Sequence, residues 1–241
     1  MIDDGEARLF PGDATGRALP PGVKGYLFSL NLQLDWVIGK MAAIYWAFDP
    51  IIHADPSTEI ERSVLALEDR HFLRHYGFEF RSLLRVLRQA ITLKRVGGVS
   101  TIEQQLVRTI VGRRERTVRR KFREIILAIL VSLRISKVKI LRCYMSTAYL
   151  GYRLRGCDEA AQTIFGKPAP HLSLEESAVV ASLLVYPVPR PLVEVFTLKE
   201  PHTVDQFWEL VSERHPAWAK KVRRRYNYCL KIRSKSKKPF I

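Results

Sequence analysis

The sequence predicts a mainly α-helical protein. Apolar residues recur at three- and four-residue steps along most of the longer segments, as they do on the buried face of a helix, and no convincing run alternates apolar with polar residues as a strand would. With 47% hydrophobic and 10% aromatic residues, the composition excludes a disordered or collagen-like chain. The 241 residues are enough to bury a core. Any strand pair should be short and lie around residues 70–100.

The N-terminal part divides into two segments. Residues 1–25 are rich in glycine and proline, which predicts an irregular lead-in. Residues 26–49 form an amphipathic helix with Asn31 and Asp35 on its polar side, and this helix either packs on the core or lies along a bilayer surface. Because polar residues interrupt the apolar stretch and the first residues are acidic, we expect neither a transmembrane helix nor an export signal.

A mostly helical domain is expected over residues 50–195. Helical spacing predicts these further helices: 59–93, 101–111, 116–135, 137–150 and 173–184. The first should kink around Tyr76 and Gly77, and the second should begin at Ser100 as its N-cap. Ser173 and Glu176 are spaced as a capping box, which fixes the start of the last of these helices.

The charge balance indicates an anionic partner. Forty Lys and Arg residues against 24 Asp and Glu give a net charge of +16, which suits nucleic acid, a membrane surface or a phosphorylated substrate. Residues 196–241 form a basic extension with ten Lys and Arg between positions 220 and 238, either a solvated tail or a binding segment for anionic lipid or nucleic acid. Three widely spaced cysteines exclude a disulfide scaffold and a structural zinc site.

The first candidate for chemistry is Glu68, which ends an apolar run and is followed by Asp69 and, further on, by His75. A carboxylate at such an apolar edge can act as a base. The alternative is a surface carboxylate paired with Arg70 or His71.

A second candidate group lies on the helix predicted over 116–135. One face of this helix carries Arg116, Arg120, Lys121 and Glu124. Seven cations within residues 113–123 would repel one another unless an anion lies among them, which indicates a phosphate or pyrophosphate site. The alternative is a set of ion pairs within the helix. The opposite face should be buried through Phe122, Ile125, Ile126, Ile129 and Leu133.

The third candidate is the glycine-containing loop before the 101–111 helix. Glycines leading into Ser100 and Thr101 present backbone N–H groups and hydroxyls to an anion. Gln104 and Gln105, on the next turn, suit hydrogen bonds to a sugar or an amide.

These groups fall into an order that resembles a known family. The chain contains ED-x-x-F-x-x-H-x-G, then G-x-S-T-x-x-Q-Q-L, R-K-x-x-E, K-x-x-I-L-x-x-Y-M-x-x-x-Y-L-G, and finally R-G-x-x-x-A-A-x-x-x-F-G-K with L-S-L-E-E-S-A-x-x-A. In this order the sequence resembles the peptidoglycan glycosyltransferases, which include the transglycosylase module of class A penicillin-binding proteins and the monofunctional biosynthetic transglycosylases. The resemblance covers roughly residues 60–192 and implies that residues 50–195 form a transglycosylase-like catalytic domain.

The resemblance implies a lysozyme-like helical domain with a small membrane-facing jaw. It implies polymerisation of lipid II into glycan strands with release of undecaprenyl pyrophosphate. Glu68 would be the general base that deprotonates the acceptor 4-hydroxyl, and inverting transfer needs such a carboxylate together with cations for the leaving group. Glu124 matches the family's second glutamate, which holds the donor site or a divalent cation, Mg²⁺ or Mn²⁺. No other cofactor is implied.

The same resemblance implies substrate contacts and partners. The residues expected to bind substrate are Asp69, His75, Ser100, Thr101, Gln104, Gln105, Arg108, Arg116, Arg120 and Lys121. Expected partners are lipid II, the nascent glycan strand and the membrane surface, with other cell-wall synthesis proteins as further candidates and no nucleic acid. The family acts at the outer face of the cytoplasmic membrane.

Four residues depart from the family pattern. Val99 replaces a glycine, Glu103 a threonine, Arg142 a glutamate and Ser146 an asparagine, and Glu103 would place negative charge beside a pyrophosphate. These departures keep open a degenerate relative that binds a lipid-linked precursor, glycan or partner protein without turnover. A lysozyme-type hydrolase would have no use for the cations, and a nucleic-acid binder would leave the carboxylates unexplained.

Overall fold

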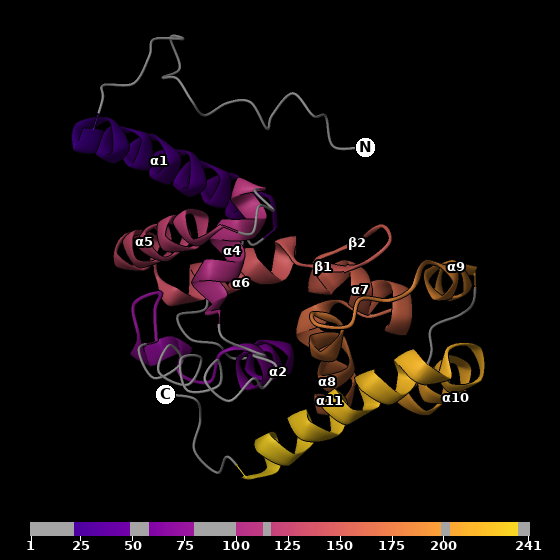
Figure 1. The fold of residues 1–241 in the computed structure, drawn as a ribbon. Coiled ribbons are helices and arrows are strands. Elements are labelled where there is room, and N and C mark those ends of the chain that lie inside the picture. The colour runs from indigo at the N-terminus through magenta and orange to yellow at the C-terminus, as the bar shows by residue number, and fades with distance from the viewer. Residues whose placement is uncertain (1–21, 49–57, 80–99, 113–116, 199–202, 236–241) are drawn as a thin grey trace. The chain divides into compact units, whose positions relative to one another are not determined.

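The structure is a computed structural model that describes residues 22–48, 58–79, 100–112, 117–198 and 203–235. Over these ranges the chain is mainly helical, as the sequence predicts (Figure 1). The chain divides into two units: the first unit comprises residues 1–50 and 75–140, and the second unit comprises residues 51–74 and 141–241. Each unit is described by itself.

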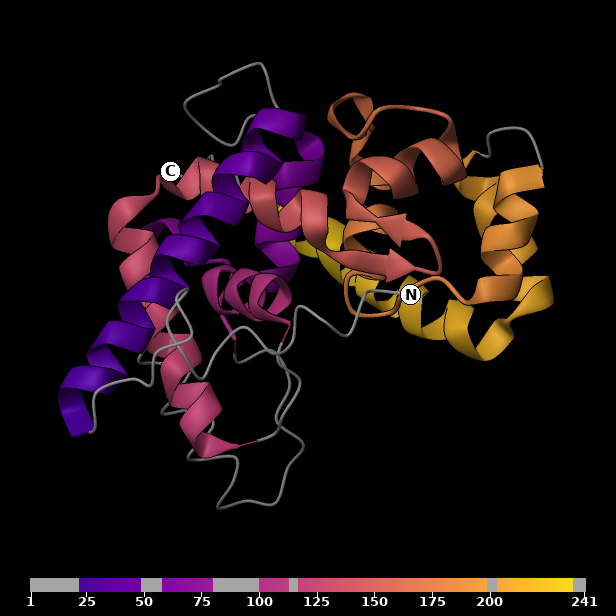
Figure 2. The same cartoon turned by 90° about the horizontal axis from the view of Figure 1, so that it is seen from above.

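The first unit is built on α1 (Gly22–Phe48), α4 (Ile102–Val111) and α5 (Val118–Arg134). Helix α1 packs against α4 and α5, and Figure 2 shows it alongside α5. Leu30, Leu34, Val37 and Met41 form its buried face at helical spacing, so α1 is docked on the core of this unit. None of the helices in the described ranges combines the length and apolar character needed to cross a bilayer.

The predicted buried face of α5 is wrong. Phe122 and Leu133 are 60% and 63% exposed, whereas Leu127, Ala128 and Val131 are buried. Apolar residues occur on nearly every side of this helix between positions 122 and 133, so its periodicity cannot select the face that contacts the unit. The prediction that the charged residues lie opposite the buried face is wrong as well, because Glu124 is itself on the buried side.

The helix predicted over 59–93 ends much earlier. Helix α2 (Glu59–Glu68) is followed by a short 3₁₀ turn, η2 (Phe72–Arg74), and positions 80–93 lie outside the described residues. Gly77 adopts a positive φ of 74°, and a Cβ there would lie 2.4 Å from the carbonyl oxygen of Ala128. A helical kink is therefore replaced by a loop that touches the backbone of α5.

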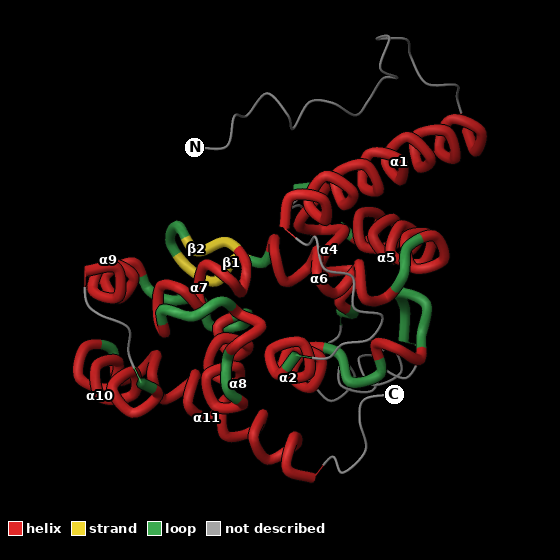
Figure 3. The backbone as a smooth tube through the Cα atoms, turned by 180° about the vertical axis from the view of Figure 1, so that it is seen from behind, coloured by secondary structure: helices red, strands yellow, loops and turns green. Residues whose placement is uncertain are grey.

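A strand pair forms outside the predicted region. Residues 70–79 hold no strand, and 80–99 lie outside the described residues. Strands β1 (Tyr149–Gly151) and β2 (Leu154–Arg155) instead pair antiparallel in the second unit, shown in yellow in Figure 3. They directly follow α6 (Lys137–Thr147), which ends before the predicted position 150.

The second unit packs around α8 (Leu174–Leu183). The same unit also contains α7 (Gly156–Phe165), the 3₁₀ turn η3 (Ala169–His171), α9 (Arg190–Leu198), α10 (Val204–Arg214) and α11 (Pro216–Lys235). Helix α8 contacts α2, α7, α10 and α11, and most of its side chains are small and fully buried. Its predicted capping box between Ser173 and Glu176 is present.

Within the predicted basic extension, residues 216–235 form a packed helix rather than a solvated tail, while residues 199–202 and 236–241 lie outside the described residues. Residues 216–235 are α11, which lies against α2, α8 and α10 and buries Ala219, Val222 and Cys229.

Helix α4 begins one residue later than predicted, because its N-cap is Thr101 rather than Ser100.

We expect Gly77→Ala to destabilise the protein strongly, because the new methyl group meets both a left-handed backbone and the Ala128 carbonyl. The expected loss in the free energy of unfolding is about 2–4 kcal/mol in a urea titration. Gly112→Ala is the matched control, since Gly112 has a φ of 70° but no atom within 4 Å of the place that a new methyl group would take. Equal losses for the two variants would contradict the close contact.

Candidate active site

Glu68 occupies the last turn of α2 and is held by a residue from the far end of the chain. Its side chain is only 8% exposed, and its Oε1 accepts a hydrogen bond from the guanidinium of Arg225 on α11. The same Arg225 nitrogen donates to the carbonyl oxygen of Leu67, at 3.3 Å. The sequence suggested Arg70 as a partner for Glu68, but Arg70 instead donates to the hydroxyl of Tyr228.

Asp69 closes α2 through its backbone. Its N–H donates to the carbonyl of Leu65 at 3.1 Å, and its own carbonyl accepts from the N–H of Phe72. The Asp69 side chain is buried. The position of Glu68 is thus fixed from both sides, by the helix before it and by this turn after it.

Lys121 is the centre of a polar cluster in the first unit. Its ammonium donates to Ser100 Oγ at 2.9 Å, to Gln104 Oε1 at 2.7 Å and to Glu124 Oε1 at 2.6 Å. An ammonium has three hydrogens, so these three acceptors use its full donor capacity. Arg120 Nη1 donates to the other oxygen of Glu124 at 2.7 Å. The predicted ion pairs within α5 therefore exist, and they surround a carboxylate that is 4% exposed.

Thr101 and Gln104 tie this cluster to the loop around Gly77. The Thr101 hydroxyl accepts from the Gln104 N–H as an N-cap and donates to the Gly77 carbonyl at 3.0 Å. Gln104 Nε2 donates to the same carbonyl at 3.0 Å, and the Gln105 side chain donates to the Ser100 carbonyl. Both ends of the Gln104 amide are therefore used inside the protein, with Lys121 and with Gly77.

The remaining predicted cations do not all face one place. Arg108 is exposed in the last turn of α4, and Arg116 lies outside the described residues. Arg123 turns toward α1, where it donates to Gln33 Oε1 and Ser29 Oγ, each at 2.6 Å. Part of the basic run therefore attaches α1 to α5 instead of being available to an anion.

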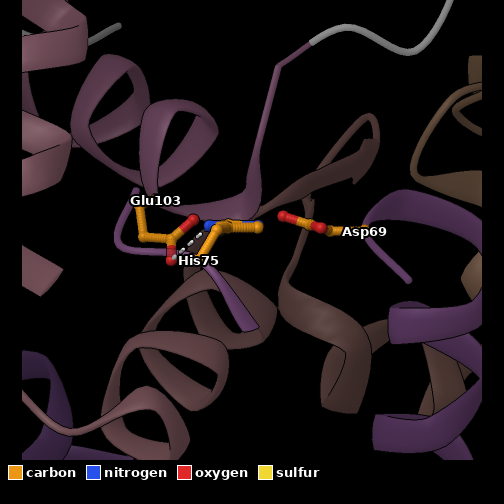
Figure 4. A group of neighbouring side chains, drawn as sticks. All are labelled: Asp69, His75 and Glu103. Carbon is orange, nitrogen blue, oxygen red and sulfur yellow. Dashed lines mark ion pairs between the residues drawn. The ribbon is translucent and has the colours of Figure 1, made fainter. Parts of the chain in front are cut away.

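His75 lies beside Glu103 rather than in the open. Figure 4 shows the His75 ring directed at the Glu103 carboxylate, with Nδ1 3.8 Å from Oε1. Glu103 is fully buried, and the ammonium of Lys137 pairs with it. The charge that this departure from the family pattern introduces is therefore neutralised within the first unit.

Arg142 is also matched by a partner. Its Nε donates to Glu61 Oε1 at 3.0 Å, while Glu61 Oε2 accepts from the backbone N–H and the hydroxyl of Thr58 in the capping box of α2. A glutamate at position 142 would face this buried carboxylate.

The other two departures are Ser146 and Val99. The carbonyl oxygen of Ser146 lies 2.7 Å from the place that a Cβ would take at Gly156, and Val99 lies outside the described residues.

The surroundings of Glu124 do not fit a hard divalent cation. Mg²⁺ requires several oxygen ligands, but both Glu124 oxygens accept hydrogen bonds from positively charged groups. A metal ion there would have to displace Lys121 or Arg120 and bind among cations. Glu124 is therefore better described as a counter-charge for these two side chains than as a metal ligand.

Cysteine chemistry does not contribute near Glu68. Cys143, Cys157 and Cys229 are all buried thiols. Burial, with smaller contributions from Asp158 and Glu68, raises the pKa of the Cys157 thiol to about 12. This thiol stays protonated at neutral pH and is not a nucleophile.

Comparison with known proteins gives one consistent result. A model of the transglycosylase family matches residues 48–214. The chain is 37% identical to penicillin-binding protein 1A of Pseudomonas aeruginosa over 135 residues, which are 56% of this chain and 16% of that protein. It is 36% identical to the biosynthetic peptidoglycan transglycosylase of Alcanivorax borkumensis over 136 residues, which cover 56% of this chain and 54% of that protein. The aligned segment thus spans about half, or less, of these relatives.

We predict that Arg142→Glu will lower the free energy of unfolding by about 3–5 kcal/mol, because it leaves the buried Glu61 carboxylate facing a like charge. Urea titration followed by circular dichroism measures this loss. Arg190→Glu is the control, since it reverses the charge of an exposed pair with Glu194 and should leave stability close to that of the wild type. A mild effect of Arg142→Glu would show that the Glu61 pair is not needed.

Proposed function

Because this chain belongs to the transglycosylase family, we propose that it is a peptidoglycan glycosyltransferase that joins lipid-II disaccharides into glycan strands. The observation that carries the proposal is the cluster of Lys121 and Arg120 on the buried Glu124, next to Ser100 and Gln104. Polymerisation from a pyrophosphate-linked sugar needs such cations, whereas hydrolysis of a finished glycan releases no pyrophosphate.

In the proposed reaction Glu68 is the general base. The 4-hydroxyl oxygen of the acceptor sugar attacks C1 of the donor sugar, and Glu68 takes the hydroxyl proton. The bond between C1 and the pyrophosphate oxygen breaks, its electron pair leaves with undecaprenyl pyrophosphate, and the configuration at C1 inverts.

Lys121 and Arg120 would stabilise the charge that develops on the leaving pyrophosphate. Arginine suits bidentate binding of phosphate oxygens, and lysine acts as a point charge. A phosphate oxygen could replace the neutral Ser100 hydroxyl or the Gln104 amide oxygen as an acceptor for the Lys121 ammonium, a change that strengthens the interaction. Glu124 would then keep both cations in place while substrate and product exchange.

The second candidate function is binding of a lipid-linked precursor, glycan or partner protein without turnover. The observation that favours it is the low exposure of Glu68 together with its contact to Arg225, because a general base must reach its substrate. Assays with substrate distinguish the two functions.

We expect Glu68→Gln to reduce the initial rate of lipid II polymerisation at least about 100-fold, because the amide cannot accept the proton. Glu124→Gln should also reduce it, since Lys121 and Arg120 lose their counter-charge. Glu194→Gln, on the exposed face of α9, is the control and should keep the wild-type rate. Gel analysis of labelled lipid II measures all four proteins. A near-normal rate for Glu68→Gln would rule out Glu68 as the base, and binding without polymer in the wild type would favour the second function.

A membrane contact is proposed for the first unit. Large apolar side chains are exposed on α1 and α5: Val23, Leu27, Phe28, Val118, Phe122 and Leu133. A lipid-linked substrate is presented at a bilayer, and exposed apolar groups beside basic residues suit a surface of anionic lipid.

Phe122→Asp should weaken co-sedimentation with vesicles of anionic phospholipid at low salt, because it places a charge where an apolar ring would enter the headgroup region. Leu198→Asp is the control, since Leu198 is also an exposed apolar residue but belongs to α9 in the second unit. If the wild-type protein does not co-sediment, or if both variants bind as it does, the membrane contact is wrong.

A further inference from the structure

Helix α11 runs antiparallel to α2 and contacts it through one arginine at each end of α2. Arg233 donates to Glu59 at 2.6 Å at the start of α2, and Arg225 reaches Leu67 and Glu68 at its end. The two arginines lie eight residues apart on one face of α11, with the buried Cys229 between them. Figures 1 and 3 show α11 beside α8, and α8 contacts both α2 and α11.

The Arg225 contact is not explained by stability alone. Arg225 and Glu68 are 19% and 8% exposed, so both charges are largely removed from water, and such burial costs much of what the attraction returns. A buried pair is therefore weak evidence for a stabilising role, which leaves room for a role in orienting Glu68.

The geometry of the contact fixes Glu68 relative to its own helix. One nitrogen of Arg225 binds both the Glu68 carboxylate and the Leu67 carbonyl, which belongs to the rigid last turn of α2. The carboxylate is thereby tied to an adjacent backbone atom. A free glutamate side chain samples several rotamers, and fixing one costs up to about 2 kcal/mol of conformational entropy.

We propose that Arg225 is a positioning residue that holds the Glu68 carboxylate in one orientation for proton transfer. This inference rests on the proposed function, in which Glu68 is the general base. The family match ends at residue 214, so the positioning group comes from a helix beyond the matched segment. Because a base must lie within hydrogen-bond reach of the hydroxyl, a displacement of about 1 Å can cost up to about 100-fold in rate.

The kinetic test uses the full chain with lipid II. Arg225→Gln should lower kcat about 10- to 100-fold and change KM by less than about threefold, because substrate binding does not depend on the orientation of the base. Arg225→Lys should recover part of kcat, since an ammonium can still donate to the carboxylate. Arg233→Gln removes an arginine contact between the same two helices away from Glu68, and it should keep kcat within about twofold.

Two results would overturn the proposal. Equal kcat values for Arg225→Gln and Arg233→Gln would mean that the α11 contact acts only on the fold. A higher kcat for Arg225→Gln would make Arg225 a brake on Glu68 rather than its positioning group.

A second measurement does not depend on activity. Urea unfolding of Glu68→Gln, Arg225→Gln and the double variant forms a double-mutant cycle. The double variant should lose less stability than the sum of the single losses, because the second substitution removes a partner already lost. Additive losses would mean that Arg225 does not hold Glu68. If the wild type makes no glycan, the proposed function fails, and the cycle still decides whether this contact exists.

Discussion

A carboxylate that leaves water must meet a positive charge, and this requirement organises the structure. Arg142 meets Glu61, Arg225 meets Glu68, Lys137 meets Glu103, Lys121 and Arg120 meet Glu124, and Lys167 meets Glu176. These contacts pair six cations with five carboxylates inside the two units. They therefore leave almost all of the net charge of +16 unmatched, and this remaining excess still indicates an anionic partner.

The fold was predictable wherever the information is local. The spacing of apolar residues located α1, and a capping box located the start of α8, because each depends on residues a few positions apart. Two predictions failed where the deciding contact is distant. The loop at Gly77 is set by the backbone of Ala128, and the buried face of α5 is set by its neighbours α1 and α4. Neither contact leaves a periodic signal in its own segment.

For the candidate site too, contacts between residues close in the sequence were predictable and distant contacts were not. The pairs of Arg120 and Lys121 with Glu124 are four and three residues apart, respectively, on one helix, so the sequence predicts them. Arg225 is 157 residues from Glu68, and a basic composition made α11 resemble a tail. A signal was present: Val222, Cys229 and Ala219 interrupt the cations at helical spacing, which is typical of a helix that packs one face.

The departures from the family pattern can be judged by the same physical requirement. A buried charge without a partner would cost several kcal/mol. Glu103 has Lys137 and Arg142 has Glu61, so both substitutions are matched by partners within their own units. Such compensation preserves α4 and α2, which carry Gln104 and Glu68. These two departures therefore change the supports of the candidate residues and leave the residues themselves in place. In the proposed reaction, turnover of lipid II then depends on Glu68, Glu124 and their cations.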